Sequence, residues 1–156
     1  MRGFWQKLLP PQASNDYRGS KTASVVFLVL AVVSLIRSLI HIFAPDGGAG
    51  SIAGLDLAVS GAQGIVLAFS LWGGAQLITA CVQLVVWFRY RNLLPLMYVL
   101  LILEYLLRIL AGIMKPAQFA HVPPGQIANY AIPMLAVVML VMTLIDRKKP
   151  GEKADT

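Results

Sequence analysis

A glutamate and two arginines stand inside apolar stretches of this chain. Glu104 and Arg108 are four residues apart, so on a helix they share one face, with the glutamate on the N-terminal side, the favourable order for an ion pair. Residues 35–45 align without a gap with residues 106–116, which places Arg37 against Arg108. Ionisable groups are costly inside a bilayer, so each of the three is a candidate functional residue.

Two further polar side chains are expected at a similar depth. At a rise of roughly 1.5 Å per residue, Arg37 and Arg108 each lie roughly 22 Å along their helices, and Glu104 roughly 16 Å. Counted back along the second apolar stretch, Gln76 falls near roughly 18 Å, and His41 lies one turn beyond Arg37. These five residues form the predicted polar cluster, open towards the outside of the membrane.

The cluster has two interpretations. Two arginines and one glutamate leave an excess of one positive charge, which suits an anionic small molecule or a lipid headgroup held by forked hydrogen bonds from Arg37 and Arg108. Alternatively, Glu104 pairs with one arginine in a structural salt bridge that fixes helix register, while the other arginine extends to the headgroups.

Other chemistry has little support in the sequence. His41 has only His121 as a second histidine, which is a weak ligand set, so no metal and no cofactor is predicted. The single cysteine, Cys81, cannot form an intrachain disulfide. The glycines of residues 47–54 are not followed by a Lys-Ser/Thr pair, which argues against a nucleotide loop. No catalytic residues are predicted.

The composition is that of an integral membrane protein. Of 156 residues, 58% are hydrophobic and 13% charged, with mean hydropathy +0.72, whereas soluble domains carry about 25% charged residues. The net charge of +6 comes from basic residues that flank apolar runs, so it indicates membrane topology and lipid contact rather than nucleic-acid binding.

An all-α transmembrane four-helix bundle is therefore expected in residues 22–146. The predicted spans are residues 22–44, 64–88, 93–114 and 127–145. The alignment between the first and third spans predicts two repeated helical hairpins, unless it is a chance match between leucine-rich helices.

The polar ends of the chain complete the predicted organisation. Residues 1–21 include Phe4 and Trp5, and form either a short interfacial segment or a loosely held tail. Asn92 is expected to cap the third span. Residues 147–156 form a charged tail.

Basic residues predict the orientation. The two loops expected outside carry only Lys115, and the opposite side carries ten basic residues. That asymmetry places both termini in the cytoplasm. The ten are Arg2, Lys7, Arg18, Lys21, Arg89, Arg91, Arg147, Lys148, Lys149 and Lys153.

The layout resembles the DoxX family and related small bacterial four-helix membrane proteins. The likeness consists of Arg37 near the end of the first span, Arg108 before Pro116 in the third, and the basic C-terminal end. It implies an accessory protein of a bacterial inner membrane, sometimes beside redox enzymes.

Two functions follow as predictions. The first is a non-enzymatic accessory or assembly subunit, with membrane lipids and either another subunit or a second copy of the chain as partners. The alternative is binding or transport of an anionic small molecule or lipid at the polar cluster.

Overall fold

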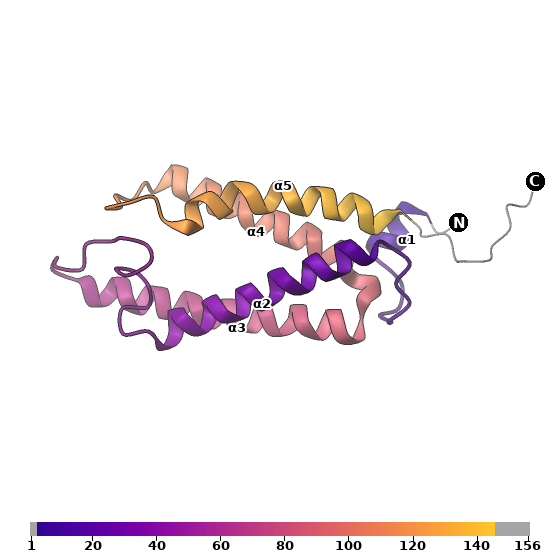
Figure 1. Ribbon diagram of the computed structural model, residues 1–156, viewed down its shortest axis with the longest axis horizontal. Helices are drawn as coiled ribbons and strands as arrows, with labels where there is room; N and C mark the ends of the chain where they lie inside the picture. Colours follow the sequence, from indigo (N-terminus) through magenta and orange to yellow (C-terminus); the bar gives the residue numbers. More distant parts are fainter. Residues whose placement is uncertain (1–2, 146–156) are drawn as a thin grey trace, which may run out of the picture.

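Four long antiparallel helices make up most of the molecule (Figure 1). The structure, a computed structural model, describes residues 3–145, so the predicted tail 147–156 lies outside the described residues. The long helices are α2 (Lys21–Phe43), α3 (Ala62–Arg89), α4 (Leu94–Met114) and α5 (Pro124–Leu144); α1 (Phe4–Leu8) and the 3₁₀ turn η1 (Arg91–Leu93) are short. All four long helices are long and apolar enough to cross a membrane. The predicted all-α fold is confirmed.

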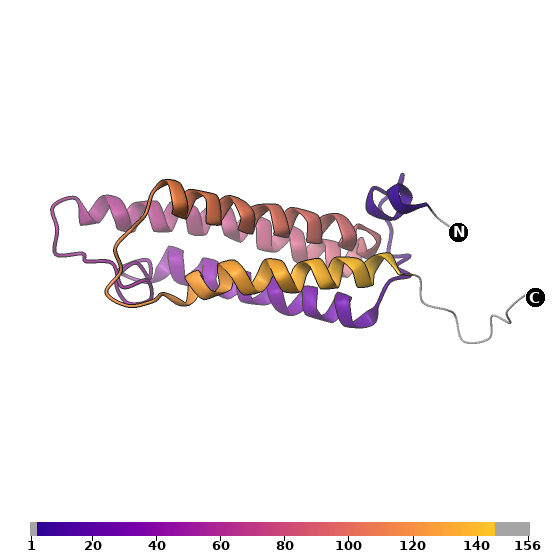
Figure 2. The ribbon, with the colours of Figure 1, turned by 90° about the horizontal axis from the view of Figure 1, so that it is seen from above.

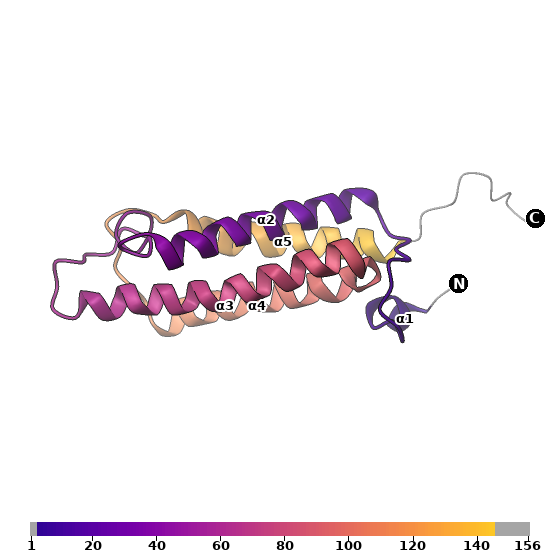
Figure 3. The same cartoon turned by 90° about the horizontal axis from the view of Figure 1, so that it is seen from below.

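The helices form two hairpins. α2 packs mainly against α3, and α4 mainly against α5. Figures 2 and 3 show α2 and α5 along one side of the bundle and α3 and α4 along the other. Residues 3 and 145 lie at one end with the α3–α4 turn, here named the termini end. The opposite end, with the loops of residues 44–61 and 115–123, is named the loop end (Figure 1).

The two hairpins are tightly packed together at the termini end. Phe27 of α2 and Tyr98 of α4 are buried there, with ring centroids 5.4 Å apart in an edge-to-face arrangement. The Tyr98 hydroxyl donates a hydrogen bond of 2.6 Å to the carbonyl oxygen of Ala23. A diagonal contact between helices of different hairpins thus has both apolar burial and a satisfied polar group.

Towards the loop end the hairpins diverge, as Figure 1 shows for α2 and α5. Within the first hairpin the helices stay close. A Cβ atom added at Gly73 of α3 would come within 2.6 Å of the His41 Cβ and 3.1 Å of the Ser38 carbonyl oxygen on α2. The opening therefore lies between the hairpins and not within the first one.

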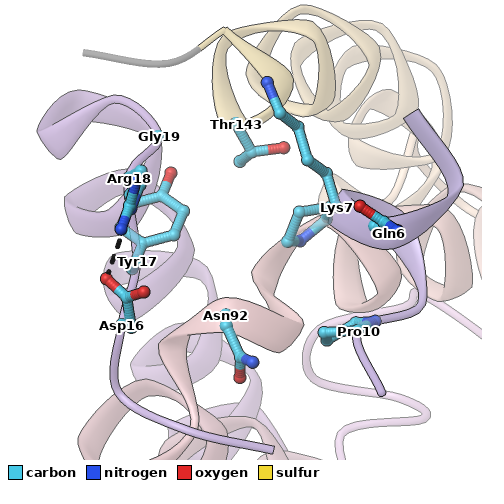
Figure 4. A pocket seen from close by; sticks show the side chains of 10 residues that line it. Gln6, Lys7, Pro10, Asp16, Tyr17, Arg18, Gly19, Asn92 and Thr143 are labelled. Carbon is cyan, nitrogen blue, oxygen red and sulfur yellow. Dashed lines mark ion pairs between the residues drawn. The ribbon is translucent and has the colours of Figure 1, made fainter. Parts of the chain in front are cut away.

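The N-terminal segment is bound to the helix ends rather than free (Figure 4). The Lys7 ammonium donates to the carbonyl oxygen of Leu144 at 2.8 Å, which satisfies a terminal carbonyl of α5. The Asn92 side chain accepts from the Ser14 N–H at 2.8 Å and donates to the Gln12 carbonyl at 2.7 Å. The expectation that Asn92 caps the third span was wrong, because its side chain is used by the N-terminal segment and α4 begins at Leu94 with no side-chain cap.

The last helix begins earlier than predicted. α5 starts at Pro124, a residue suited to a first helical position because its missing N–H would have no partner there. Pro133 therefore lies well inside the helix. It has no N–H to donate to the carbonyl of Asn129, four residues earlier.

The two loops touch each other across the loop end. The Ala120 N–H donates to the Gly54 carbonyl oxygen at 2.9 Å. Gly54 has φ +70°, a conformation that favours glycine, and a Cβ there would meet the exposed His121 ring at 2.7 Å, so that ring would have to move. In the first loop, the N–H groups of Ser51 and Gly48 donate to the Asp46 carboxylate and lower its pKa to about 2.

Candidate functional site

A cavity of about 650 Å³ lies between the hairpins at the loop end. All four long helices and both loops contribute to its lining. It is the structural consequence of hairpins that meet at the termini end and diverge beyond it. The volume is in the range of sites that hold a small organic molecule.

Trp72 of α3 brings the two intramembrane arginines together. The guanidinium carbon of Arg37 lies 5.2 Å from the centre of the Trp72 ring, and that of Arg108 lies 4.9 Å from it. Arg108 also lies 5.1 Å from the ring centre of Tyr105 on its own helix. Each contact is an attractive cation–π interaction. The two contacts with Trp72, however, hold two positive charges close to each other.

Both guanidinium groups have hydrogen-bonding capacity that the described chain does not use. The Nε atoms of Arg37 and Arg108 are buried and have no hydrogen-bond partner among residues 3–145. Within the same described residues, Arg37 has no carboxylate ion-pair partner. Unsatisfied donors in a low-dielectric region are destabilising, so the pair is electrostatically incomplete as it stands.

His41 lies against the same tryptophan. Its ring centre is 4.8 Å from that of Trp72, and its Nδ1 is 2.7 Å from the carbonyl oxygen of Gly47. Because a carbonyl only accepts, Nδ1 carries a proton and donates. The Nε2 atom is buried without a partner among the described residues, so His41 offers a third polar atom in the cavity lining.

Glu104 and Arg108 form the ion pair expected from their spacing. The pair is not deeply buried within the chain, since the Glu104 side chain is 37% exposed. Glu104 does not line the cavity. Its carboxylate pairs with the Arg108 guanidinium and neutralises it, so the Arg37 guanidinium is the positive charge without a paired carboxylate in the described part of the chain.

Gln76 lies elsewhere. It is buried, three residues from Gly73 on the face of α3 that packs against α2, and it does not line the cavity. Of the five predicted cluster residues, the structure thus places three in the cavity lining: Arg37, His41 and Arg108.

Sequence reasoning missed several lining residues with functional potential. Trp72 was visible as the start of a polar stripe on the second span, and Tyr105 precedes Arg108 by three residues, on the same helix face. Neither signal identifies a contact between hairpins. Asn129 and Gln126 of α5 also line the cavity and carried no pattern that singled them out.

A second, small cavity lies at the termini end (Figure 4). Its volume is about 30 Å³, and Lys7, Tyr17 and Thr143 are among its lining residues. Burial raises the pKa of the Tyr17 hydroxyl, which donates to the Ser20 carbonyl oxygen at 3.0 Å. The cavity has room for little more than a water molecule and belongs to the contact between the N-terminal segment and the helix ends.

Comparisons with protein-family models, with curated proteins and with solved structures find no match for this chain. The resemblance to the DoxX family stays a prediction. Within residues 3–145, no group of three or more histidine, cysteine, aspartate or glutamate side chains is close enough to hold a metal ion.

Proposed function

We propose that this protein is a non-enzymatic membrane protein that binds an anionic small molecule or lipid in the loop-end cavity. The observation that carries the proposal is the placement of Arg37 and Arg108 over one tryptophan ring, each with a buried Nε that has no partner within residues 3–145. A phosphate or carboxylate between them would accept those hydrogen bonds and separate the like charges.

The charge balance supports an anionic ligand. Arg37 and Arg108 contribute two positive charges, and Glu104 contributes one negative charge. The remaining positive charge is opposed by no described carboxylate. A bound anion is the simplest means of making such a site stable inside a membrane.

The distribution of basic residues supports cytoplasmic termini and an inner-membrane location. Lys7, Arg18, Arg89 and Arg91 are at the termini end of the described chain, and the loops at the other end carry Lys115 alone. In this orientation the cavity lies in the extracytoplasmic half of the bundle.

The accessory-subunit role stays a second candidate. It rests on the small size of the chain and on the lack of predicted catalytic residues. An accessory subunit should be purified together with another polypeptide, whereas a binding protein should carry a small ligand. One measurement can distinguish these two outcomes.

Native mass spectrometry of protein extracted gently from its own membrane tests both functions. We expect a bound small anion or lipid on the wild-type chain, lost in Arg37→Gln and in Arg108→Gln. Arg91→Gln is the matched control, since Arg91 also lies over a tryptophan, 4.4 Å from the Trp87 ring centre, but outside the cavity. A second polypeptide without a small ligand, or a ligand that both cavity variants retain, would contradict the binding role.

A further inference from the structure

We propose that the ligand of this cavity is a membrane lipid with a single negative charge, which enters sideways between the hairpins. Its phosphodiester would lie between Arg37 and Arg108, and one acyl chain would extend towards the membrane centre. This inference rests on the proposed function and specifies the ligand class and its route.

The cavity lining changes from polar to apolar along the bundle. Arg37 lies at the polar level, with Val33 and Leu30 lining the cavity one and two turns nearer the termini end. The seven residues from Arg37 to Leu30 correspond to about 10 Å of helix. Ile132 of α5 and Leu101 of α4 add apolar side chains to the same part of the lining. A soluble anion would leave this apolar part of the cavity empty, whereas an acyl chain would fill it.

The cavity is open to the surroundings of the bundle. Among its large apolar lining side chains, Val33 is 53% exposed, Tyr130 58% and Ile113 72%. They lie on three different long helices. Val33 is within the apolar length of α2, so the opening beside it faces the hydrocarbon region. A lipid can reach the arginines there without crossing the loops.

The charge of the site favours a monoanion. At the level of Trp72, the two guanidinium groups of Arg37 and Arg108 and the Glu104 carboxylate sum to one positive charge, which a phosphodiester neutralises. Lys115, a further basic residue of the lining, is exposed in the loop beyond α4. Asn129 and Gln126, also in the lining, offer amide groups to headgroup hydroxyls or ester oxygens. A zwitterionic headgroup would bring its own cation next to two guanidinium groups, and is therefore disfavoured.

Fluorescence of Trp72 gives a direct test. The full chain with Trp5→Phe and Trp87→Phe is reconstituted in phosphatidylcholine vesicles containing, at equal mole fraction, either phosphatidylglycerol or phosphatidylcholine with a brominated acyl chain. Bromine quenches nearby tryptophan. We expect the anionic lipid to quench Trp72 with roughly tenfold higher apparent affinity, the effect of one charge-assisted contact. Arg37→Gln should abolish this preference, and Arg37→Lys, which keeps the charge but not the fork, should weaken it.

A pair of valines on α2 tests the route. Val33→Phe places a larger side chain at the lateral opening and should reduce quenching severalfold. Val29→Phe is the control, because Val29 is equally exposed, at 55%, and does not line the cavity. Equal quenching in both variants would overturn the lateral route.

Competition with inorganic phosphate separates this inference from the proposed function. If phosphate changes Trp72 emission in an Arg37-dependent way while the brominated lipids quench equally, the ligand is a soluble anion and the lipid inference is wrong. If neither phosphate nor lipid charge has an Arg37-dependent effect, the proposed function is wrong as well. A preference for the anionic lipid that phosphate does not reduce supports both the lipid inference and the proposed function.

Discussion

The termini end and the loop end of the bundle use similar apolar helices in different ways. At the termini end, the hairpins meet over buried side chains such as Phe27 and Tyr98, and the polar hydroxyl there is satisfied within the chain. At the loop end, the same helices separate around a cavity lined by Arg37, His41 and Arg108, each of which has a buried nitrogen without a partner among the residues that the structure describes. The packed end therefore stabilises the fold, and the open end is the place where the proposed ligand would bind.

Truncating one phenylalanine towards each end of α2 is the strongest test of whether the two ends of the bundle differ in packing. Phe27→Ala should lower the free energy of unfolding by about 3–5 kcal/mol, since Phe27 is 1% exposed and its removal leaves a cavity. Phe43→Ala should change it by less than about 0.5 kcal/mol, since Phe43 is 76% exposed. Unfolding by denaturant in detergent micelles measures both. Comparable losses would show that the ends do not differ in this way.

Neighbouring glycines on α3 sharpen the comparison within the loop end. Gly73→Ala should destabilise the protein by about 1–3 kcal/mol, because its Cβ would overlap His41 and Ser38 of α2. Gly74→Ala should be neutral or stabilising by up to about 1 kcal/mol, because nothing lies within 4 Å of a Cβ there. Thermal unfolding of the two variants is the measurement. Equal melting temperatures would contradict the tight packing of α2 on α3.

Removing a tyrosine hydroxyl at each end of the bundle should have a smaller effect on stability. Tyr98→Phe removes the hydrogen bond to the Ala23 carbonyl and should lower the free energy of unfolding by about 1 kcal/mol. Tyr130→Phe at the loop end should leave stability unchanged, because Tyr130 is 58% exposed. Denaturant midpoints of the two variants in the same detergent make the comparison. A larger loss in Tyr130→Phe would run against the assignment of the packed end.

The smallest expected effect is acid loosening of the first loop. The pKa of Asp46 falls from its ordinary value of 3.8 to about 2 on folding, because the carboxylate accepts the N–H groups of Ser51 and Gly48. Its contribution is therefore present above about pH 4 and is lost as the pH falls towards 2. Amide exchange at Gly48 and Ser51 should lose protection over that range. Asp46→Asn should lower protection at neutral pH and remove the acid transition.

Much of the fold could be predicted because membrane crossing places strong demands on sequence. The four apolar runs, the short Arg89–Asn92 turn and the arginine-containing spans were all visible, and the helices lie close to the predicted boundaries. Pairing of Glu104 with Arg108 followed from helix periodicity alone.

The contacts between helices could not be predicted in the same way. Gln76 shares a stripe with Trp72 in the sequence, but the close approach at Gly73 turns Gln76 towards α2 and leaves Trp72 in the cavity lining. A rotation of one helix by a fraction of a turn would exchange such neighbours. Asn92 was misassigned for a related reason, since its partners Gln12 and Ser14 lie about 80 residues away in the chain.

The bonds of Lys7 to α5 and of Asn92 to the N-terminal segment hold both hairpins at the termini end, and therefore act as a fulcrum. Each hairpin is a lever of about 30 Å, the length of roughly 20 helical residues. Turning one lever by 5° about that fulcrum displaces its far end by about 2.6 Å. The Ala120–Gly54 bond and the 3.3 Å contact of His121 Nε2 with the Ile52 carbonyl oxygen join the two levers where this displacement is greatest, so these loop contacts limit how wide the cavity between them stands.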